Sequence, residues 1–365
     1  MSIFAALKLL PPTSPSAADE YAQKQEIIQN NVSQAIAKLN SLYNFTGNCP
    51  LEMIGDVHRH HTLFMSSVFR LNNYTLLARM LVWMYRTYHS HGFSYDYFTY
   101  ALSEWRKAIT HTISPANVAE IDGVYQWIIE RHPDFLQLAE ATDYHVFPYK
   151  QTQATDDFVM HLLHGEYQGC LAIGKDYLAA KSLAEFYVEV IEPSMYEVGR
   201  LWEIGHISIA QEHLATAVVS RVMLSLFVGA EKRETTSAKA VIAAAPNELH
   251  EVGARMVADL LEHQGWEVDY LGANVPKEYL LQYLIENQPC FLGLSIAMPY
   301  NLAAAQEAIK EIRSACICGI KIMAGGAAFK HSEDLWRQIG VDAYAVDGNA
   351  AIEIARKWKE AKPIR

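Results

Sequence analysis

The sequence has few cysteines and no long apolar run. Its five cysteines among 365 residues are odd in number and scattered, which argues against a disulfide framework and is typical of free thiols in a reducing cytoplasm. No apolar run reaches the roughly 18 residues that a membrane-spanning helix needs. The first residues, MSIFAALKLLPPTSPS, lack the charged and apolar segments of a signal peptide. We therefore expect a cytoplasmic protein without a membrane segment.

Positive charge is also scarce. The chain has 30 Lys and Arg against 41 Asp and Glu, a formal net charge of -11. Such a chain repels nucleic-acid phosphates and anionic membranes unless it carries a compact basic patch, and only short clusters such as Lys232-Arg233 are present. Direct binding to nucleic acid or to a membrane is therefore not expected. Hydrophobic residues make up 51% of the chain, enough to build large folded cores.

The pattern of apolar residues changes near residue 230. Residues 1–18 are rich in proline, serine and alanine and are predicted to be a loose lead-in. From there to about residue 230, apolar residues recur at spacings of three and four, which predicts helices nearly throughout. The polar segment 231–238 (EKRETTSA) has no such period. It is predicted to be a linker.

Strand-like and helical segments alternate after this linker. The strand-like runs are 239–246, 266–271, 291–297, 321–324 and 343–346, and the helical ones are about 249–264, 277–287, 301–315, 332–339 and 350–361. This alternation predicts a flavodoxin-like domain with a five-stranded parallel doubly wound sheet. The predicted fold class is α plus α/β, with an N-terminal all-helical domain at 1–148, a four-helix-bundle cap at 149–232 and the flavodoxin-like domain at 239–365.

The loop after the first predicted strand offers a histidine where such sheets bind ligands. It reads PNELHEVG from Pro246 to Gly253 and lacks the G-x-G-x-x-G pattern of dinucleotide-binding folds. His250 could ligate a metal through one ring nitrogen while the other donates to Glu248, two residues earlier. Gly253 leaves room for a ligand beside the next helix. A lone solvated histidine in a loop would give the same local pattern.

Two later loops favour the ligand site. The third predicted strand carries Ser295, and doubly wound order places this strand beside the first. The fourth ends in Gly325-Gly326, followed by small residues. Paired glycines leave a strand edge without obstructing side chains, where a planar group can insert.

Taken together, Glu-x-His-x-x-Gly, the Ser295 loop and Gly-Gly resemble the cobalamin-binding domain of methionine synthase, corrinoid methyl carriers and cobalamin photoreceptors. The resemblance implies cobalamin bound base-off, with His250 as the lower cobalt ligand and Glu248 and Ser295 relaying hydrogen bonds to it. Gly325 and Gly326 would line the slot for the nucleotide tail. Glu248 stands where the family pattern has Asp, although Glu also occurs in the photoreceptor branch. Ala297 stands where carriers often have Leu.

The stretch before the linker predicts a cap over the upper face of the cofactor. Ser208 and Gln211 form an S-x-x-Q capping box, which predicts the start of a helix. A helix that ends at a glycine, followed by this capped helix, could direct Trp202, Glu212 and His213 to one point. Ordinary helix packing would use the same residues. Trp-x9-Glu-His directly before a cobalamin domain resembles the cap of CarH-type cobalamin photoreceptors, which implies that these three side chains cover the adenosyl group.

The N-terminal region carries no recognisable DNA-binding helix-turn-helix. It is rich in histidines and aromatics, namely His58, His60, His61, Trp83, Tyr85, Tyr88, His89, His91, Phe93, Tyr95, Tyr97, Phe98 and Trp105. An ordinary bundle core explains this composition. Three close histidines also raise the possibility of a metal, although their spacing fits no standard site. The domain order is similar to photocobilins, which implies a second chromophore, biliverdin. No cysteine lies in an obvious attachment motif, so that a bilin is expected to bind non-covalently.

The predicted function is that of a light sensor using adenosylcobalamin, not an enzyme. Its expected output is a light-dependent change in homo-oligomeric state or in binding of a protein partner. The alternative is a corrinoid methyl carrier that serves a methyltransferase. A cobalamin-dependent mutase is disfavoured because the chain has no substrate barrel.

Overall fold

The structure, a computed structural model, describes residues 3–39, 41–141, 152–229, 238–315, 319–331 and 334–360. The chain divides into two compact units. One comprises Met1–Val146 with Glu203–Gly205, and the other comprises Phe147–Trp202 with His206–Arg365. Nearly all of the predicted linker lies outside the described residues.

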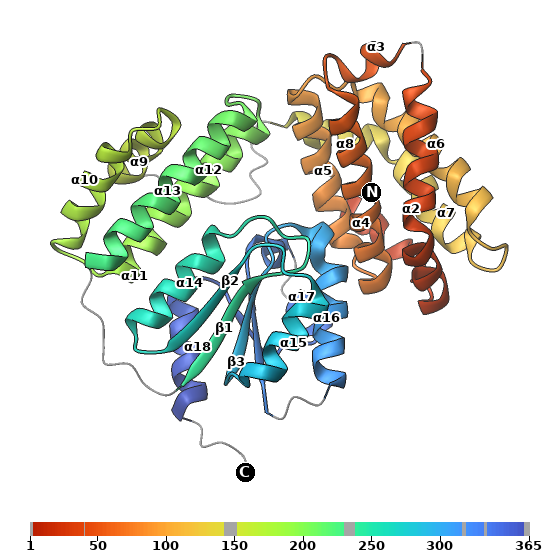
Figure 1. Ribbon diagram of the computed structural model, residues 1–365. Helices are drawn as coiled ribbons and strands as arrows, with labels where there is room; N and C mark the ends of the chain where they lie inside the picture. Colours follow the sequence, from red (N-terminus) through yellow and green to blue (C-terminus); the bar gives the residue numbers. More distant parts are fainter. Residues whose placement is uncertain are drawn as a thin grey trace. The chain divides into compact units, whose positions relative to one another are not determined.

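Every described element of the first unit is a helix (Figure 1). They are α1 (Ile3–Ala6), η1 (Leu7–Leu9), α2 (Pro15–Ala37), α3 (Leu42–Thr46), α4 (Leu51–Leu71), α5 (Tyr74–Ser90), α6 (Tyr95–Thr112), α7 (Val118–Glu130) and α8 (His132–Glu140). Helix α2 packs against α4, α6 and α7. Many aromatic residues of this region line the inside of this helical bundle, and Tyr21, Phe69, Tyr85 and Tyr125 are fully buried.

The sequence predicts a helix break at Asn72-Asn73 and a helix start at Ser114-Pro115, a capping residue followed by proline. Asn72 adopts a left-handed conformation that ends α4, and the Asn73 side chain accepts from Leu76 N to begin α5, as the Asn-Asn break indicates. The expectation of a loose lead-in over residues 1–18 was wrong, because Ser14 caps α2 and Ala17 is buried within it. Ser114-Pro115 opens a turn rather than a helix, and α7 begins at Val118.

A bundle of helices forms the first part of the second unit (Figure 1). They are α9 (Gln153–Leu163), α10 (Tyr167–Leu178), the continuous run of α11 (Leu183–Phe186), the π-helix η2 (Tyr187–Ile191) and α12 (Glu192–Glu203), and α13 (Ile209–Gly229). Their shared core contains Phe158, Phe186 and Val222. The predicted capping box is confirmed, since Gln211 N donates to Ser208 Oγ and Ser208 N donates to Gln211 Oε1.

The second part is the predicted five-stranded parallel sheet. Its strands are β1 (Lys239–Ala244), β2 (Glu267–Gly272), β3 (Phe291–Ser295), β4 (Lys321–Gly325) and β5 (Ala343–Ala345), in the order β2-β1-β3-β4-β5. This is the flavodoxin-like strand order. Strands β1 and β3 read as nearly continuous apolar runs because helices cover both faces of the sheet.

Helices α14 (Val252–His263) and α18 (Gly348–Glu360) cover one face of the sheet, and α15 (Lys277–Asn287), α16 (Leu302–Ser314) and α17 (Leu335–Gln338) cover the other (Figure 1). Two short helices, η3 (Pro299–Asn301) and η4 (Ala327–His331), follow β3 and β4. The predicted fold class, α plus α/β with a flavodoxin-like C-terminal part, is confirmed.

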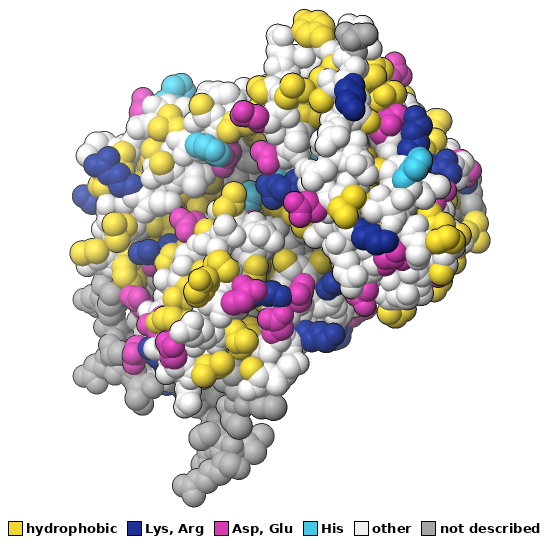
Figure 2. Space-filling model, turned by 45° about the vertical axis from the view of Figure 1, so that its right-hand side comes forward, with side chains coloured by type: hydrophobic (Ala, Val, Ile, Leu, Met, Phe, Trp, Pro, Cys, Tyr) yellow, Lys and Arg dark blue, Asp and Glu magenta, His cyan; other side chains and the backbone are white. Residues whose placement is uncertain are grey.

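The distribution of charged side chains on the surface agrees with the absence of a compact basic patch from the sequence. On the face shown in Figure 2, Lys and Arg side chains are interspersed with Asp and Glu. Within the part of the chain that the structure describes, no helix is long and apolar enough to cross a bilayer.

Candidate functional site

The candidate site lies where the strand order of the sheet reverses. Strands β1 and β3 are neighbours whose connections run to opposite faces, and Ala245 N donates to Ser295 O just beyond their carboxyl ends. Sheets of this kind open a crevice at this point, and ligands bind there. The loop that carries His250 leaves β1 at this crevice.

His250 rests on a buried carboxylate and leaves the rest of its ring accessible. Nδ1 lies 2.5 Å from Glu248 Oε1, and His250 N donates to the same oxygen over 3.0 Å. Glu248 is fully buried, whereas 57% of the His250 side chain is exposed. With the proton on Nδ1, the ring is held in one orientation and Nε2 is available to a metal.

Glu248 is the centre of this arrangement. Its other oxygen, Oε2, accepts from Ala297 N, Met298 N and Asn301 Nδ2 at 2.9–3.0 Å. A fully buried carboxylate is costly unless its acceptor positions are filled, and here both oxygens are bonded. These donors hold the Glu248 carboxylate in place, and the carboxylate in turn fixes the orientation of the His250 imidazole.

The protonation of this pair follows from its surroundings. Burial tends to raise the pKa of Glu248, but the hydrogen bond and charge of His250, with the donors from Met298 and Asn301, bring that pKa below its ordinary value. Desolvation tends to lower the pKa of His250, but Glu248, and then Glu212, raise it above its ordinary value. The carboxylate is therefore ionised, and it makes the imidazole a more basic ligand.

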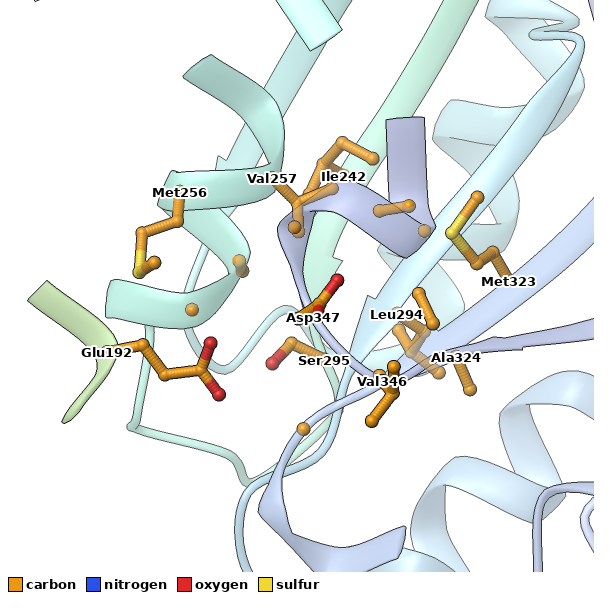
Figure 3. Close-up of a pocket in the computed structure, with 18 of the residues that line it drawn as sticks. Glu192, Ile242, Met256, Val257, Leu294, Ser295, Met323, Ala324, Val346 and Asp347 are labelled. Atoms are coloured by element: carbon orange, nitrogen blue, oxygen red, sulfur yellow. The ribbon is translucent and has the colours of Figure 1, made fainter. Parts of the chain in front are cut away.

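Four small residues predicted from the sequence line one pocket. Gly253, Ser295, Gly325 and Gly326 lie around a space of about 720 Å³, its open side included (Figure 3). Ser295 faces this pocket, and among the described residues its hydroxyl makes no hydrogen bond to His250 or Glu248. Asn301 instead donates to Glu248, because η3 turns its buried amide back toward the carboxylate. The expected relay through Ser295 is therefore replaced by Asn301 in the structure.

Gly326 is required by backbone geometry. Its φ is 107°, and a Cβ there would lie 2.3 Å from Ile296 O, which is backbone and cannot give way. A Cβ on Gly253, by contrast, would meet only Ser295 Oγ at 3.9 Å. Gly326 is thus needed for the backbone conformation that follows β4, whereas Gly253 leaves space in the pocket.

We expect Gly326→Ala to lower the free energy of unfolding by about 2 kcal/mol or more, because it combines a positive φ with a backbone clash. Gly253→Ala should leave stability unchanged or raise it by about 0.5–1 kcal/mol, since alanine favours a helix. Urea unfolding of both variants checks this. Equal destabilisation of the two would contradict the geometry.

The predicted cap residues lie on two helices of the bundle. Trp202, near the end of α12, is half-buried and packs against the bundle core. Glu212 lies in the first turn of α13 and His213 follows it, with His213 Nδ1 2.5 Å from Glu212 Oε2. His213 is 75% exposed. Glu212 is close enough to His250 for its charge to act on that ring, so the structure brings this cap residue toward the candidate ligand.

Three further residues line the pocket without any local sequence signal. They are Glu192 and Tyr196 on α12, and Lys330 on η4. Figure 3 shows the Glu192 carboxylate and the Ser295 hydroxyl pointing toward each other across the pocket. Nothing in the spacing of these residues marks them, because they come from segments far apart in the chain.

The first unit has a second, narrow pocket, with a space of about 370 Å³ when its open side is included. It is lined by Val57, His58, His61, Leu81, Met84, Tyr85, Tyr88, Tyr97, Phe98, Ala101, Leu102 and Trp105. His58 contacts Ser33 Oγ and Tyr97 OH, each at 2.8 Å, and His61 contacts Tyr125 OH at 3.2 Å. Burial lowers the pKa of His58 to about 4 and that of His61 to about 3, so both rings are neutral.

The three close histidines do not converge on a metal in the structure. His60 lies on the exposed side of α4, beside Arg59, while His58 and His61 face inward. Among the described residues, no three His, Cys, Asp or Glu side chains are grouped closely enough to hold a metal ion.

Comparison with known proteins finds two family models that match parts of the second unit. Residues 238–355 match the family model of the B12 binding domain, and residues 154–226 match a second B12 binding domain model. Both matches coincide with the described architecture, the sheet with His250 and the helical bundle before it. They support a cobalamin-binding protein with a corrinoid cofactor.

Two kinds of relative share this region. The chain is 30% identical over 169 residues to the HTH-type transcriptional repressor CarH of Myxococcus xanthus, an alignment that covers 46% of this chain and 56% of the repressor. It is 26% identical over 180 residues to dimethylamine corrinoid protein 3 of Methanosarcina acetivorans, covering 46% and 81%. The chain thus spans little more than half of the length of CarH.

A solved structure has a similar fold. The monomethylamine corrinoid protein of Methanosarcina barkeri superposes with a TM-score of 0.51 at 22% identity, covering 56% of this chain and 98% of that protein. At this identity the likeness concerns the fold alone.

Proposed function

We propose that this chain is a light sensor that binds adenosylcobalamin base-off, with His250 as the lower cobalt ligand. The observation that carries the proposal is the hydrogen bond between the accessible His250 ring and the buried Glu248 at the switch point of the sheet. In this proposal, residues 239–365 bind the cofactor, residues 149–232 form its cap, and residues 1–148 form a separate helical domain.

The described residues fit a corrin ring and its tail. Leu249 and Val346, which follow β1 and β5, are 71% and 55% exposed at the carboxyl edge of the sheet. Exposed apolar side chains around a metal ligand suit a large, largely apolar ring. The pocket bounded by Gly253, Ser295 and Gly326 would take the nucleotide tail, because these residues leave the space that side chains would otherwise fill.

The cap supports a sensor over a carrier. Glu212 acts electrostatically on His250, and Trp202 and His213 lie on the same helix pair. When bound, adenosylcobalamin supplies a cobalt–carbon bond that visible light breaks. The chain's own part is to cover that upper ligand with Trp202, Glu212 and His213 and to rearrange its helices when the ligand leaves. The resemblance to CarH-type photoreceptors favours this role over catalysis.

We expect light to change the assembly of the loaded protein. Protein loaded with adenosylcobalamin in the dark should elute at a different volume on size-exclusion chromatography after green or blue light, because loss of the upper ligand empties the space under the cap. Hydroxocobalamin-loaded protein is the control. Identical elution after complete photolysis, verified by absorbance, would reject the switch.

A corrinoid methyl carrier is the second candidate. It is favoured by the similarity to dimethylamine corrinoid protein 3, of which the alignment covers 81%. A carrier would bind methylcobalamin as well as adenosylcobalamin and would exchange the methyl group with a partner enzyme. Paired titrations with the two cobalamins therefore separate the candidates: a preference for adenosylcobalamin supports the sensor.

We also propose that the pocket of the first unit binds a second, non-covalent chromophore such as biliverdin, as the similarity of the domain order to photocobilins implies. Its aromatic walls suit a tetrapyrrole, and Tyr85, Tyr88 and Tyr97 lie among them. Biliverdin added to the purified protein should give a sharpened, red-shifted absorption band if it binds there. The same band in Tyr97→Ala, or no band in the wild type, would contradict this assignment.

A further inference from the structure

The tail pocket has an apolar end and a charged end. Ile242, Leu294 and Met323 lie at its buried end, each at most 3% exposed. Lys330, Glu192 and Tyr196 lie at the other end, where the side chains of the first two remain 26% and 23% exposed. A ligand that matches this pocket has an apolar ring joined to a charged linker.

Among the described residues that line this pocket, Lys330 is the only cation. Its Nζ lies 3.3 Å from Glu192 Oε1 and 4.0 Å from the centre of the Tyr196 ring. Both partners come from α12 of the cap, one turn apart, while Lys330 follows the Gly325-Gly326 edge. The ammonium group is thus held beside the space that the glycines leave open.

We infer that Lys330 binds the phosphodiester of a corrinoid nucleotide tail, and that Glu192 occupies the place of this anion until the tail enters. The inference rests on the proposed function and deepens it, because it names the side chains that select the charged part of the tail. A nucleotide tail has both parts. Its base ring suits the apolar end, and its phosphodiester carries a single negative charge, to which the Lys330 ammonium can donate a hydrogen bond.

Glu192 is suited to being displaced. Burial raises its pKa above the ordinary value, and the charge of Lys330 only partly offsets this. The nearby Asp347 adds a second negative charge, and it is held in place by accepting from Ala350 N at the start of α18. The Glu192 carboxylate is therefore a weak competitor for Lys330 compared with a phosphodiester, whose charge does not depend on protonation near neutral pH.

The test compares two corrinoids that differ only by the tail. Hydroxocobalamin carries the nucleotide, and cobinamide has the same ring without it. Both are titrated by absorbance into the full-length protein in the dark, using the wild type, Lys330→Met and Glu192→Gln. Lys321→Met is the matched control, since Lys321 lies at the opposite end of β4 and pairs with Asp342.

The two variants should act in opposite directions. Lys330→Met should weaken cobalamin binding by about tenfold or more and leave cobinamide unchanged, because it removes a charged hydrogen-bond donor. Glu192→Gln should strengthen cobalamin binding by roughly threefold to tenfold, because it removes the competing charge. Lys321→Met should change neither.

Other results would overturn the inference. If Lys330→Met weakened the binding of both corrinoids equally, Lys330 would stabilise the cap rather than bind the tail. Unchanged cobalamin binding in Lys330→Met would remove it from the tail site, and weaker cobalamin binding in Glu192→Gln would refute the competition. A wild type that binds neither corrinoid would refute the proposed function itself. This outcome is distinct from the others, because each of them is observed in a wild-type protein that does bind cobalamin.

Discussion

His250→Ala should lower the affinity for cobalamin by about a hundredfold or more. Loss of a partner that only orients a ligand costs 10–100-fold in metal affinity, and this substitution removes the proposed ligand itself. Glu248 would also lose the imidazole partner of Oε1, keep only the backbone N of residue 250 there, and remain fully buried. The absorption spectrum of any remaining complex should lack the features of cobalt bound through a protein imidazole. Equilibrium titration followed by absorbance measures both effects.

Two neighbours serve as controls for His250. Glu248→Gln keeps the shape of the side chain but removes its charge, so that we expect an intermediate loss of about 10–100-fold. Leu249→Ala alters an exposed apolar residue beside the ligand and should cost far less than His250→Ala. If His250→Ala binds cobalamin with the affinity and spectrum of the wild type, the ligand assignment is wrong.

Trp202→Ala should abolish the preference for adenosylcobalamin over methylcobalamin and blunt the light-dependent change in assembly. The proposal places the indole against the adenosyl group, so that its removal deletes contacts that a methyl group never makes. Part of the indole packs against the bundle core, and we therefore expect a loss of about 1–2 kcal/mol in stability, less than for a fully buried tryptophan. Paired titrations and size-exclusion chromatography in dark and light measure the outcome.

Tyr167→Ala is the matched control for Trp202. Tyr167 also packs half-buried against the bundle core, and it bonds Ser225 on α13. Both variants should lower the melting temperature, but only Trp202→Ala should lose selectivity. If a folded Trp202→Ala retains both selectivity and the light response, the cap does not sense the upper ligand. If both variants unfold alike, Trp202 acts as a core residue.

Much of the fold was predictable because its signals are local. The apolar runs of β1 and β3 and the helical periods between strands specify a parallel sheet with two covered faces. The carboxyl edge of that sheet then brings His250 and the Gly325-Gly326 pair to one crevice. Glu248 was found because it lies only two residues from the histidine that it orients.

Errors in the sequence-based prediction have physical causes as well. Residues 1–18 contain three prolines and three serines, yet Ser14 and Pro15 begin a helix rather than prevent one, since proline is tolerated in the first turn. Ser114 and Pro115 resemble a helix start, but their backbone forms a turn, and Ser114 donates to Glu20 instead. In both places the local sequence is compatible with either a helix start or a turn, and tertiary contacts decide which of the two forms.

The sequence by itself determined the order of strands and helices, the histidine loop and the glycine edge, because each depends on residues close together in the chain. Only the tertiary structure decided that Asn301 completes the shell of Glu248 from 53 residues away and that Glu192 meets Lys330 from 138 residues away. Contacts of this kind leave no period or spacing in the sequence. They arise when packing of the sheet and the cap brings distant polar groups into a buried space, where each must find a partner.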